Sequence, residues 1–380
     1  MINWNELVLI HNSNIAVIDA DLIGRKKHRF PNLVCMKISS YYKGKGCNVE
    51  LKTDYKNLDK YKAVFVAKVF TDTEVPKEVL ERENVFYDGT GFYYDKAGKL
   101  PNDIEHCFPD YHLYDTWVQD KRTGGVDRRE LVYYLDYSIG FLTRGCFRRC
   151  QFCVNKNSKE SVVASPLLEF LDKSKPKICL LDDNFFACSS CILLMEELRK
   201  TGKRFRFKQG LDERLLTKEK IDLLFSSKTD GDLIFAFDDI NDQSIICKKL
   251  DMIKTQIPNN RKTLKFYIFC GFDRRGIWNE SFWKDDIYSV FRRIEILMSY
   301  GSIPYIMRFN KYVESPHKGI YINLARWCNQ PNFFKKKSFR EFCVANGKNS
   351  ACYRYMEQFE KDYPDISKYF DMEFEKEKTK

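Results

Sequence analysis

Three cysteines lie within eight residues of the stretch 140-GFLTRGCFRRCQFCVNKN-157, at positions Cys146, Cys150 and Cys153. Their C-x3-C-x2-C spacing, on a short loop that begins with glycine, suits a cubane iron–sulfur cluster in which one iron has no protein ligand. Structural zinc takes four protein ligands, so a zinc site here would need a distant fourth residue. The arginines between and before the cysteines would offset the charge of three thiolates. The loop therefore predicts a redox-active metal centre, with structural zinc as the alternative.

Composition restricts where this chemistry takes place. The 380 residues are 44% hydrophobic, and they contain no apolar run of the length that spans a bilayer. The first residues, MINWNELVLIHNSN, lack the basic region and cleavage site of a secretory signal. We therefore expect a cytoplasmic protein without a membrane partner, in which the fourteen cysteines stay reduced. The formal net charge of +11 favours an anionic partner such as a nucleic acid or a nucleotide.

The cysteine loop follows the first of six apolar segments that read as strands. These segments alternate with helix-like stretches, and they are 137–143, 177–183, 203–210, 232–239, 264–272 and 302–310. Strands separated by helices must run parallel, because each crossover returns the chain to the same end of the sheet. The pattern predicts an α/β fold with a partial (β/α)6 barrel over residues 116–312.

Polar residues gather where these strands end, which is the edge that carries the chemistry in such barrels. They are Asp182, Asp183 and Asn184 after the second strand, Gln209 and Asp212 after the third, Asp238 and Asp239 after the fourth, and Arg308 and Asn310 after the sixth. Asn184 and Asp239 are equally well explained as caps of the helices that follow them. We expect the set to line a binding site, but we assign no catalytic residue.

The segment GCFRRCQFC, at the end of the first strand of a βα series, resembles the signature of the radical S-adenosylmethionine (radical SAM) superfamily. The resemblance implies that Cys146, Cys150 and Cys153 ligate a 4Fe–4S cluster whose remaining iron binds SAM. It implies reductive cleavage of SAM to a 5′-deoxyadenosyl radical, with electrons from a reductant such as flavodoxin or ferredoxin. It also places Phe152 near the adenine.

The sequence departs from that superfamily at the end of the second strand. A Gly-Gly-Glu-like run there normally holds the SAM amino group, whereas this chain has Asp182, Asp183 and Asn184. An acidic acceptor is still present, so we assign this run to SAM. Gln209 and Asp238 are assigned to the sugar or methionine portion of SAM on their position alone.

Residues 1–115 read as a small doubly wound (Rossmann-like) domain, with strands near 14–21, 48–54, 62–70 and 84–90, followed by an irregular connector. A domain of this kind before a radical SAM barrel resembles the cobalamin-binding subclass, whose corrinoid ligand is the His of a D-x-H-x-x-G pattern. This chain has 19-DADLIG-24, with Asp21 in place of that His. We therefore expect a scaffold of the cobalamin-binding type that does not hold cobalamin, with binding of cobalamin without an axial ligand as the alternative.

Residues 313–380 read as a helical extension that contains the basic and aromatic stretch 326-RWCNQPNFFKKKSFREFC-343. Such a stretch can bind single-stranded nucleic acid, or it can pack as a lid. Cysteines outside the loop leave an auxiliary cluster open as an alternative; they are the pair Cys188 and Cys191, and Cys328, Cys343 and Cys352 in the extension. The sequence thus predicts a radical SAM enzyme, and the other hypothesis is a non-enzymatic metal-binding module that binds nucleic acid.

Overall fold

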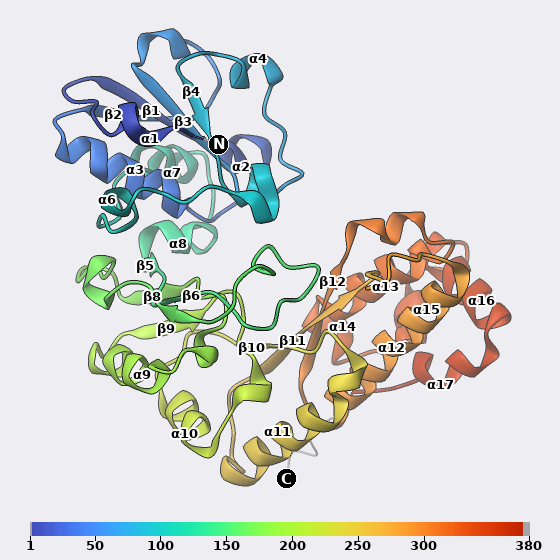
Figure 1. The fold of residues 1–380 in the computed structure, drawn as a ribbon. Helices are drawn as coiled ribbons and strands as arrows, with labels where there is room; N and C mark the ends of the chain where they lie inside the picture. The colour runs from blue at the N-terminus through green and yellow to red at the C-terminus, as the bar shows by residue number, and fades with distance from the viewer. Residues whose placement is uncertain (1, 375–380) are drawn as a thin grey trace. The chain divides into compact units, whose positions relative to one another are not determined.

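The computed structural model describes residues 2–374, which form a mixed α/β fold with parallel sheets and a helical C-terminal region (Figure 1). The chain divides into two compact units. The first consists of Met1–Asp183 with Lys200–Phe205, and the second of Asn184–Arg199 with Arg206–Lys380. The domain boundaries predicted from the sequence, near residues 115 and 312, stay predictions.

The first unit begins with a parallel sheet in the order β2-β1-β3-β4. Its strands are β1 (Asn14–Asp19), β2 (Asn48–Lys52), β3 (Ala63–Ala67) and β4 (Val85–Tyr87). The central strands β1 and β3 are apolar almost throughout, because a parallel sheet covered on both faces buries every side chain of its inner strands. The chain winds in opposite directions from β1 and from β3, which makes this boundary the switch point of the sheet.

Short helices surround this sheet. The longest is α3 (Leu33–Gly44), which begins where the side chain of Asn32 accepts hydrogen bonds from the N–H groups of Val34 and Cys35. The others are α1 (Trp4–Leu7), α2 (Ala20–Gly24), α4 (Lys77–Leu80), α5 (Thr90–Tyr93), α6 (Asn102–Glu105), α7 (Asp115–Thr123) and α8 (Val132–Leu135). Trp117 and Tyr134 from α7 and α8 share one hydrophobic core with Phe65 of β3.

All six strands expected in the second half of the chain are present. They are β5 (Tyr137–Gly140), β8 (Lys177–Leu180), β9 (Arg204–Phe207), β10 (Leu233–Ala236), β11 (Leu264–Cys270) and β12 (Ile303–Arg308). They form two three-stranded sheets, β5-β8-β9 and β10-β11-β12. A single parallel bridge between Leu211 and Phe235 connects the segment after β9 to β10. The order of the strands along the sheets follows the sequence, as expected for successive right-handed crossovers.

Four long helices follow these strands: α9 (Cys191–Lys200), α10 (Lys218–Ser226), α11 (Gln243–Gln256) and α12 (Glu280–Ser299). The prediction of a helix between β5 and β8 is wrong, because the only helical segment there is a short 3-10 turn, Leu167–Glu169. Phe170 ends that turn and packs directly on Gly140, where an added Cβ would lie 2.3 Å from the Phe170 ring. The hydroxyl of Tyr111 also donates to the carbonyl of Phe170 at 2.6 Å, so two tertiary contacts hold the end of this turn in place.

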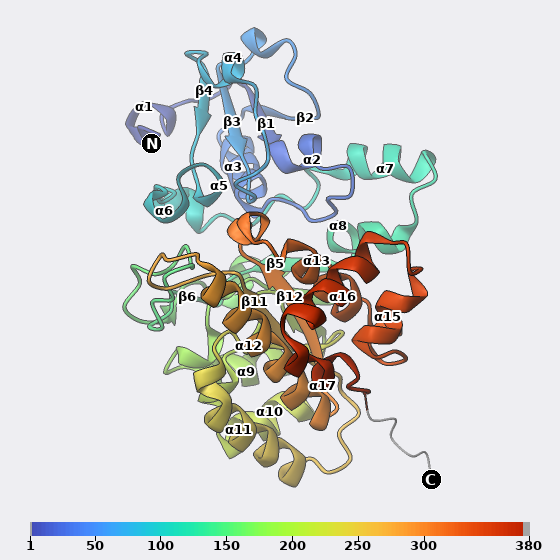
Figure 2. The same cartoon turned by 90° about the vertical axis from the view of Figure 1, so that its right-hand side faces the viewer.

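The C-terminal region is helical and packs on α12 (Figure 2). It contains α13 (Lys318–Cys328), α14 (Pro331–Phe334), α15 (Phe339–Ala345), α16 (Ala351–Asp362) and α17 (Ser367–Phe370). The aromatic side chains Trp327, Phe334, Phe339 and Phe342 are buried, so they build the core of this region. No described helix is both long and apolar enough to cross a lipid bilayer.

Candidate functional site

The cysteine loop begins just after β5, the first strand of the sheet β5-β8-β9. Two short strands, β6 (Thr143–Arg144) and β7 (Val162–Val163), pair in antiparallel fashion and close the base of the loop. Gly145 has φ +94°, and a Cβ there would lie 2.2 Å from the carbonyl oxygen of Glu160. Only glycine fits this first position of the loop, because the conformation and the close approach both exclude a side chain.

Asp183 joins the two ends of the loop. One carboxylate oxygen accepts a hydrogen bond from the N–H of Gly145 at 2.7 Å, and the other accepts from the side-chain amide of Asn155 at 2.6 Å. The three cysteines lie between these two anchor points. Hydrogen bonds to a carboxylate are stronger than those between neutral groups, so Asp183 holds the two ends of the loop together.

Asp182 anchors the approach to the same loop. It is buried, and one carboxylate oxygen accepts from both the N–H and the hydroxyl of Thr143, at 2.6 and 2.7 Å. Burial raises the pKa of Asp182 to about 6, although the hydrogen bonds from Thr143 and Leu142 oppose the shift. Both carboxylates at the end of β8 therefore contact the chain around the cysteine loop.

The thiols themselves are half-buried. Backbone N–H groups point at two of the sulfurs, from Arg148 to Cys146 and from Asn155 to Cys153, each at 3.4 Å. Such hydrogen bonds tune the potential of a cluster held by thiolates. Among residues 2–374 the side chains of His, Cys, Asp and Glu form no ready-made group of three around a metal position. Three thiolates are the donor set that iron–sulfur clusters use, but the structure does not bring these three cysteines together around one position, so their assignment stays a prediction.

Residues of the irregular connector, 89–115, contact the cysteine loop. These contacts were not predicted from the sequence. The hydroxyl of Tyr94 donates to the carbonyl of Phe152, and Asp95 forms an ion pair with Lys156 at 3.1 Å. Tyr94 has φ +53°, a conformation that is uncommon for a residue with a side chain. The signal in the sequence was a Tyr-Asp pair in a short segment with glycines on both sides.

A second contact from the connector neutralises charge at the base of the loop. Glu105 forms ion pairs with Arg144 at 3.0 Å and with Lys37 at 2.9 Å. Burial favours the neutral form of Glu105, but the charges of Lys37 and Arg144 outweigh it and lower its pKa. Arg144 is thus held by a carboxylate of its own unit.

The remaining residues assigned to SAM belong to the second unit. Asn184 is buried, and its side-chain amide donates to Asp212 at 3.4 Å. Gln209 is exposed directly after β9. Asp238 accepts from the N–H of Phe269 at 3.0 Å, and burial raises its pKa despite the nearby charge of Arg293. Asp239 caps the turn after β10 by accepting from the N–H of Asn241, as expected for a cap.

The strand ends of the second unit carry a charged network that is larger than predicted. Arg214 donates to Asp212 at 2.7 Å and to Asp242 at 2.6 Å. Glu213 lies beside them and is buried, and burial raises its pKa well above the ordinary value. The triplet Asp-Glu-Arg shortly after β9 was the available signal, because charged groups gathered at a strand end mark a candidate site.

A buried arginine was also missed. Arg293 of α12 is 2% exposed, and its guanidinium donates to the carbonyl oxygens of Phe237 and Phe269 at 2.9 and 3.0 Å. It therefore holds the ends of β10 and β11 at a fixed distance. The sequence contained the signal, since Arg293 falls on the apolar face of its helix, three residues after Val290 and four before Leu297.

The cysteines considered for an auxiliary cluster are buried. Cys188 and Cys191 are buried at the start of α9. Cys343 and Cys352 are also buried, with their sulfurs 3.6 Å apart between α15 and α16. Burial alone explains cysteines of this kind, because a thiol packs as a small hydrophobic group.

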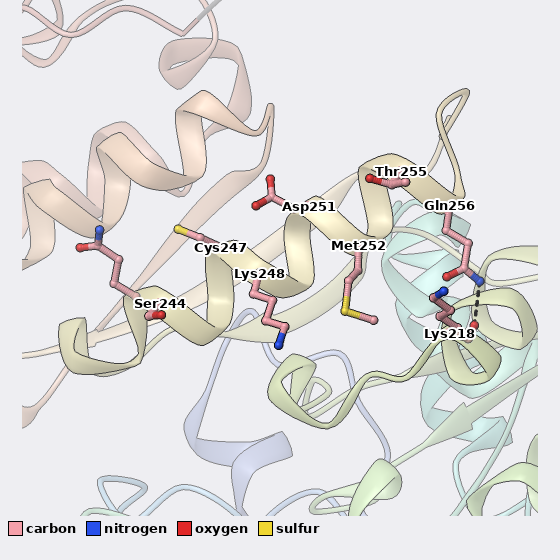
Figure 3. A pocket seen from close by; sticks show the side chains of 9 residues that line it. Lys218, Ser244, Cys247, Lys248, Asp251, Met252, Thr255 and Gln256 are labelled. Atoms are coloured by element: carbon pink, nitrogen blue, oxygen red, sulfur yellow. Dashed lines mark hydrogen bonds between the residues drawn. The ribbon is translucent and has the colours of Figure 1, made fainter.

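A hollow of about 790 Å³ lies along α11 in the second unit (Figure 3). Its side chains come from α11 and from Lys218 at the start of α10, where the amide of Gln256 donates to the Lys218 carbonyl at 2.8 Å. None of the residues predicted to bind SAM or iron lines it. The hollow is therefore separate from the candidate site.

Asp21, the residue in the place of a corrinoid ligand, is fully buried and has several partners. Its carboxylate accepts from the N–H of Val69 at 2.6 Å and from the hydroxyl of Thr73, and it lies 3.6 Å from Arg25. The side chain thus fixes the segment after β3. It points to protein atoms of its own domain.

Comparison with known proteins identifies the class of fold. No family model matches the sequence, and no curated protein matches it either. Among solved structures, the chain is similar to TsrM from Kitasatospora setae, a radical SAM methyltransferase whose structure holds cobalamin and a [4Fe–4S] cluster. The TM-score is 0.52 at 12% identity, over 79% of this chain and 75% of that chain. The chain therefore has a radical-SAM-like fold.

Proposed function

We propose that this protein is a radical SAM enzyme that holds a 4Fe–4S cluster on Cys146, Cys150 and Cys153. The observation that carries the proposal is the cysteine loop itself, which follows the first of six strands in a radical-SAM-like fold and is closed by Asp183. A cluster of this kind supplies, when reduced, the electron that cleaves SAM to methionine and a 5′-deoxyadenosyl radical.

The chain's own residues orient the reactants. Asp183 and Ser158 fix the loop, since Ser158 accepts from the N–H of Cys146 at 3.1 Å. Because the oxygens of Asp182 and Asp183 already accept hydrogen bonds from the loop, we assign the contact with the SAM amino group to the Asp182–Asn184 run as a whole. Phe152 contacts the adenine, and Gln209 and Asp238 contact the sugar or methionine portion. These assignments rest on strand position and on the resemblance.

We further propose that the reaction does not use cobalamin, in contrast to the TsrM structure. Imidazole is a good ligand for cobalt, whereas the carboxylate of Asp21 already accepts hydrogen bonds from Val69 and Thr73. Turning it outward would break its hydrogen bonds from the N–H of Val69 and the hydroxyl of Thr73. The doubly wound domain therefore has another role.

The substrate class that we propose is a nucleic acid or a nucleotide, on the basis of the +11 net charge. The burial of Trp327, Phe334, Phe339 and Phe342 argues against base stacking on those rings in the C-terminal region. A nucleic acid would instead be bound by exposed lysines and arginines. The electrons would come from a protein such as flavodoxin or ferredoxin.

The test is anaerobic reconstitution with iron and sulfide, followed by dithionite, SAM and an assay for 5′-deoxyadenosine. We expect about four irons per chain and formation of the nucleoside. Cys150→Ser should lose both, whereas Cys107→Ser, a half-exposed cysteine outside the loop, should retain both. Eight irons would indicate an auxiliary cluster. Tightly held zinc without SAM cleavage would show that the cysteines are structural and that the binding-module hypothesis holds.

A further inference from the structure

The doubly wound domain contains a cavity of about 150 Å³ at the carboxyl ends of β3 and β4. Its apolar walls include Trp4 of α1, Ile38 of α3, Phe65 of β3 and Phe86 of β4. An apolar cavity of this volume accommodates one aromatic ring. In open α/β sheets, ligands bind outside the carboxyl ends of the strands near the switch point, and this cavity lies beside that point.

The polar side chains at the rim of the cavity mostly form hydrogen bonds with other groups of the protein. Asp88 accepts from the N–H groups of Ile2 at 3.2 Å, Gly89 at 2.6 Å and Gly98 at 2.9 Å. Lys68 donates to the carbonyl oxygens of Thr71 and Thr73. Lys99 is exposed at the rim and forms no ion pair within the described chain. The charge available to a ligand is therefore the ammonium group of Lys99.

One segment connects this cavity to the cysteine loop. Asp88, Gly89 and Thr90 line the cavity at the start of the segment, and Gly98, Lys99 and Leu100 line it at the end. The middle of the same segment carries Tyr94 and Asp95, which hold the cysteine loop through Phe152 and Lys156. Gly91 has no room for a Cβ, which would lie 2.3 Å from the Lys68 carbonyl oxygen, so the segment also packs tightly on the end of β3.

We propose that this cavity binds a small ligand with one aromatic or heteroaromatic ring and an anionic group. The ring packs on the apolar side chains that line the cavity, Phe65, Phe86 and Ile38, and the anion pairs with Lys99. A bound ligand stabilises the conformation of residues 88–100, and it thereby restrains the cysteine loop through Tyr94. Binding at one site alters the other because the ligand favours one state of a shared segment. The proposal does not require the radical SAM assignment.

The test uses the metal-free full-length protein and 4-fluorobenzoate as a ¹⁹F NMR probe. We expect saturable broadening of the probe signal, displacement by benzoate or nicotinate, and no displacement by acetate. Val34→Trp, at a partly exposed position that lines the cavity, should abolish binding, and Thr90→Trp, at another position of the lining, should do the same. Val344→Trp, an exposed helical valine of α15, is the matched control and should bind normally. Lys99→Gln should weaken binding several-fold.

Coupling to the loop is read out by the rate at which iodoacetamide alkylates Cys146, Cys150 and Cys153. Saturating probe should slow this rate several-fold in the unaltered protein. In Tyr94→Phe the probe should still bind, but the slowing should be smaller, because the hydrogen bond to Phe152 is absent and only the contacts of Asp95 with the loop remain.

Several results would overturn the proposal. They are no binding of 4-fluorobenzoate at millimolar concentration, unchanged binding in both tryptophan variants, or an alkylation rate that saturating probe does not alter. Displacement of the probe by hydroxocobalamin would assign the cavity to a corrinoid, and it would also contradict the cobalamin-independent function proposed above. Failure of SAM cleavage by the reconstituted protein would leave the ligand assignment standing, because no readout used here involves iron.

Discussion

At the scale of single residues, one carboxylate organises the candidate site. Asp183 contacts Gly145 and Asn155, on either side of the three cysteines. The sequence indicated an acidic residue at this strand end and suggested a role in binding SAM. The structure adds a role in shaping the loop, because the carboxylate accepts one hydrogen bond from each end of it.

Asp183→Ala should therefore affect iron as well as SAM. Loss of two hydrogen bonds to a charged acceptor removes about 1.5–3 kcal/mol each, so the loop should open more often. We expect faster alkylation of the loop cysteines in the metal-free protein and lower iron content after reconstitution. Asp172→Ala is the matched control, since Asp172 also accepts two hydrogen bonds, both from Ser174, at a site outside the loop. Equal iron content in the two variants would contradict the role of Asp183.

The sequence alone could predict only those site residues that belong to a recognisable pattern, such as a motif or the end of a strand. Cys146, Cys150 and Cys153 have a spacing, and Asp182 and Asp183 have a place at a strand end. Tyr94 and Glu105 have neither, because their contacts with the loop join segments that are 58 and 39 residues apart. Such contacts depend on how an irregular connector packs, and local propensity does not determine that.

At the scale of elements, the alternation of strands and helices was predicted well because its periodicity is strong. The six strands after residue 136 and the four before it are present. The exception is the segment between β5 and β8, whose apolar residues at 167, 168 and 170 suggest a helix. Its conformation is instead set by Phe170 packing on Gly140 and by Tyr111. A tertiary contact here overrides local preference.

Gly140→Ala tests that contact. The added Cβ would lie 2.3 Å from the Phe170 ring, so we expect the free energy of unfolding to fall by about 1–3 kcal/mol. Urea unfolding measures the change. The same substitution at Gly44, where a Cβ would meet nothing within 4 Å, should be neutral or stabilising. Phe170→Leu in the Gly140→Ala background should recover part of the loss, and a purely additive double variant would refute the contact.

At the scale of the whole molecule, a buried carboxylate connects stability to pH. Burial raises the pKa of Asp19 to about 7, and the nearby charge of Asp21 adds to the shift while the Tyr114 hydroxyl opposes it. In the unfolded chain the pKa is near 3.8. Between these values the folded state holds a proton that the unfolded state releases, so this group makes the protein less stable as pH rises from about 4 to about 7.

Asp19→Asn should remove this dependence. The amide oxygen can still accept from Tyr114, which donates to Asp19 at 3.0 Å, and no charge is buried. We expect the variant to be more stable than the unaltered protein by about 1–4 kcal/mol at pH 8, and the difference to vanish below about pH 4. Urea titrations at four pH values measure it. A difference that stays constant with pH would show that Asp19 does not titrate in this range.

The contacts that close the cysteine loop are all made by protein atoms: the carboxylate of Asp183, the hydroxyl of Ser158 and the pairing of Thr143 with Val163. We therefore expect the metal-free protein to keep this loop closed, so that reconstitution with iron and sulfide should not require the chain to be refolded.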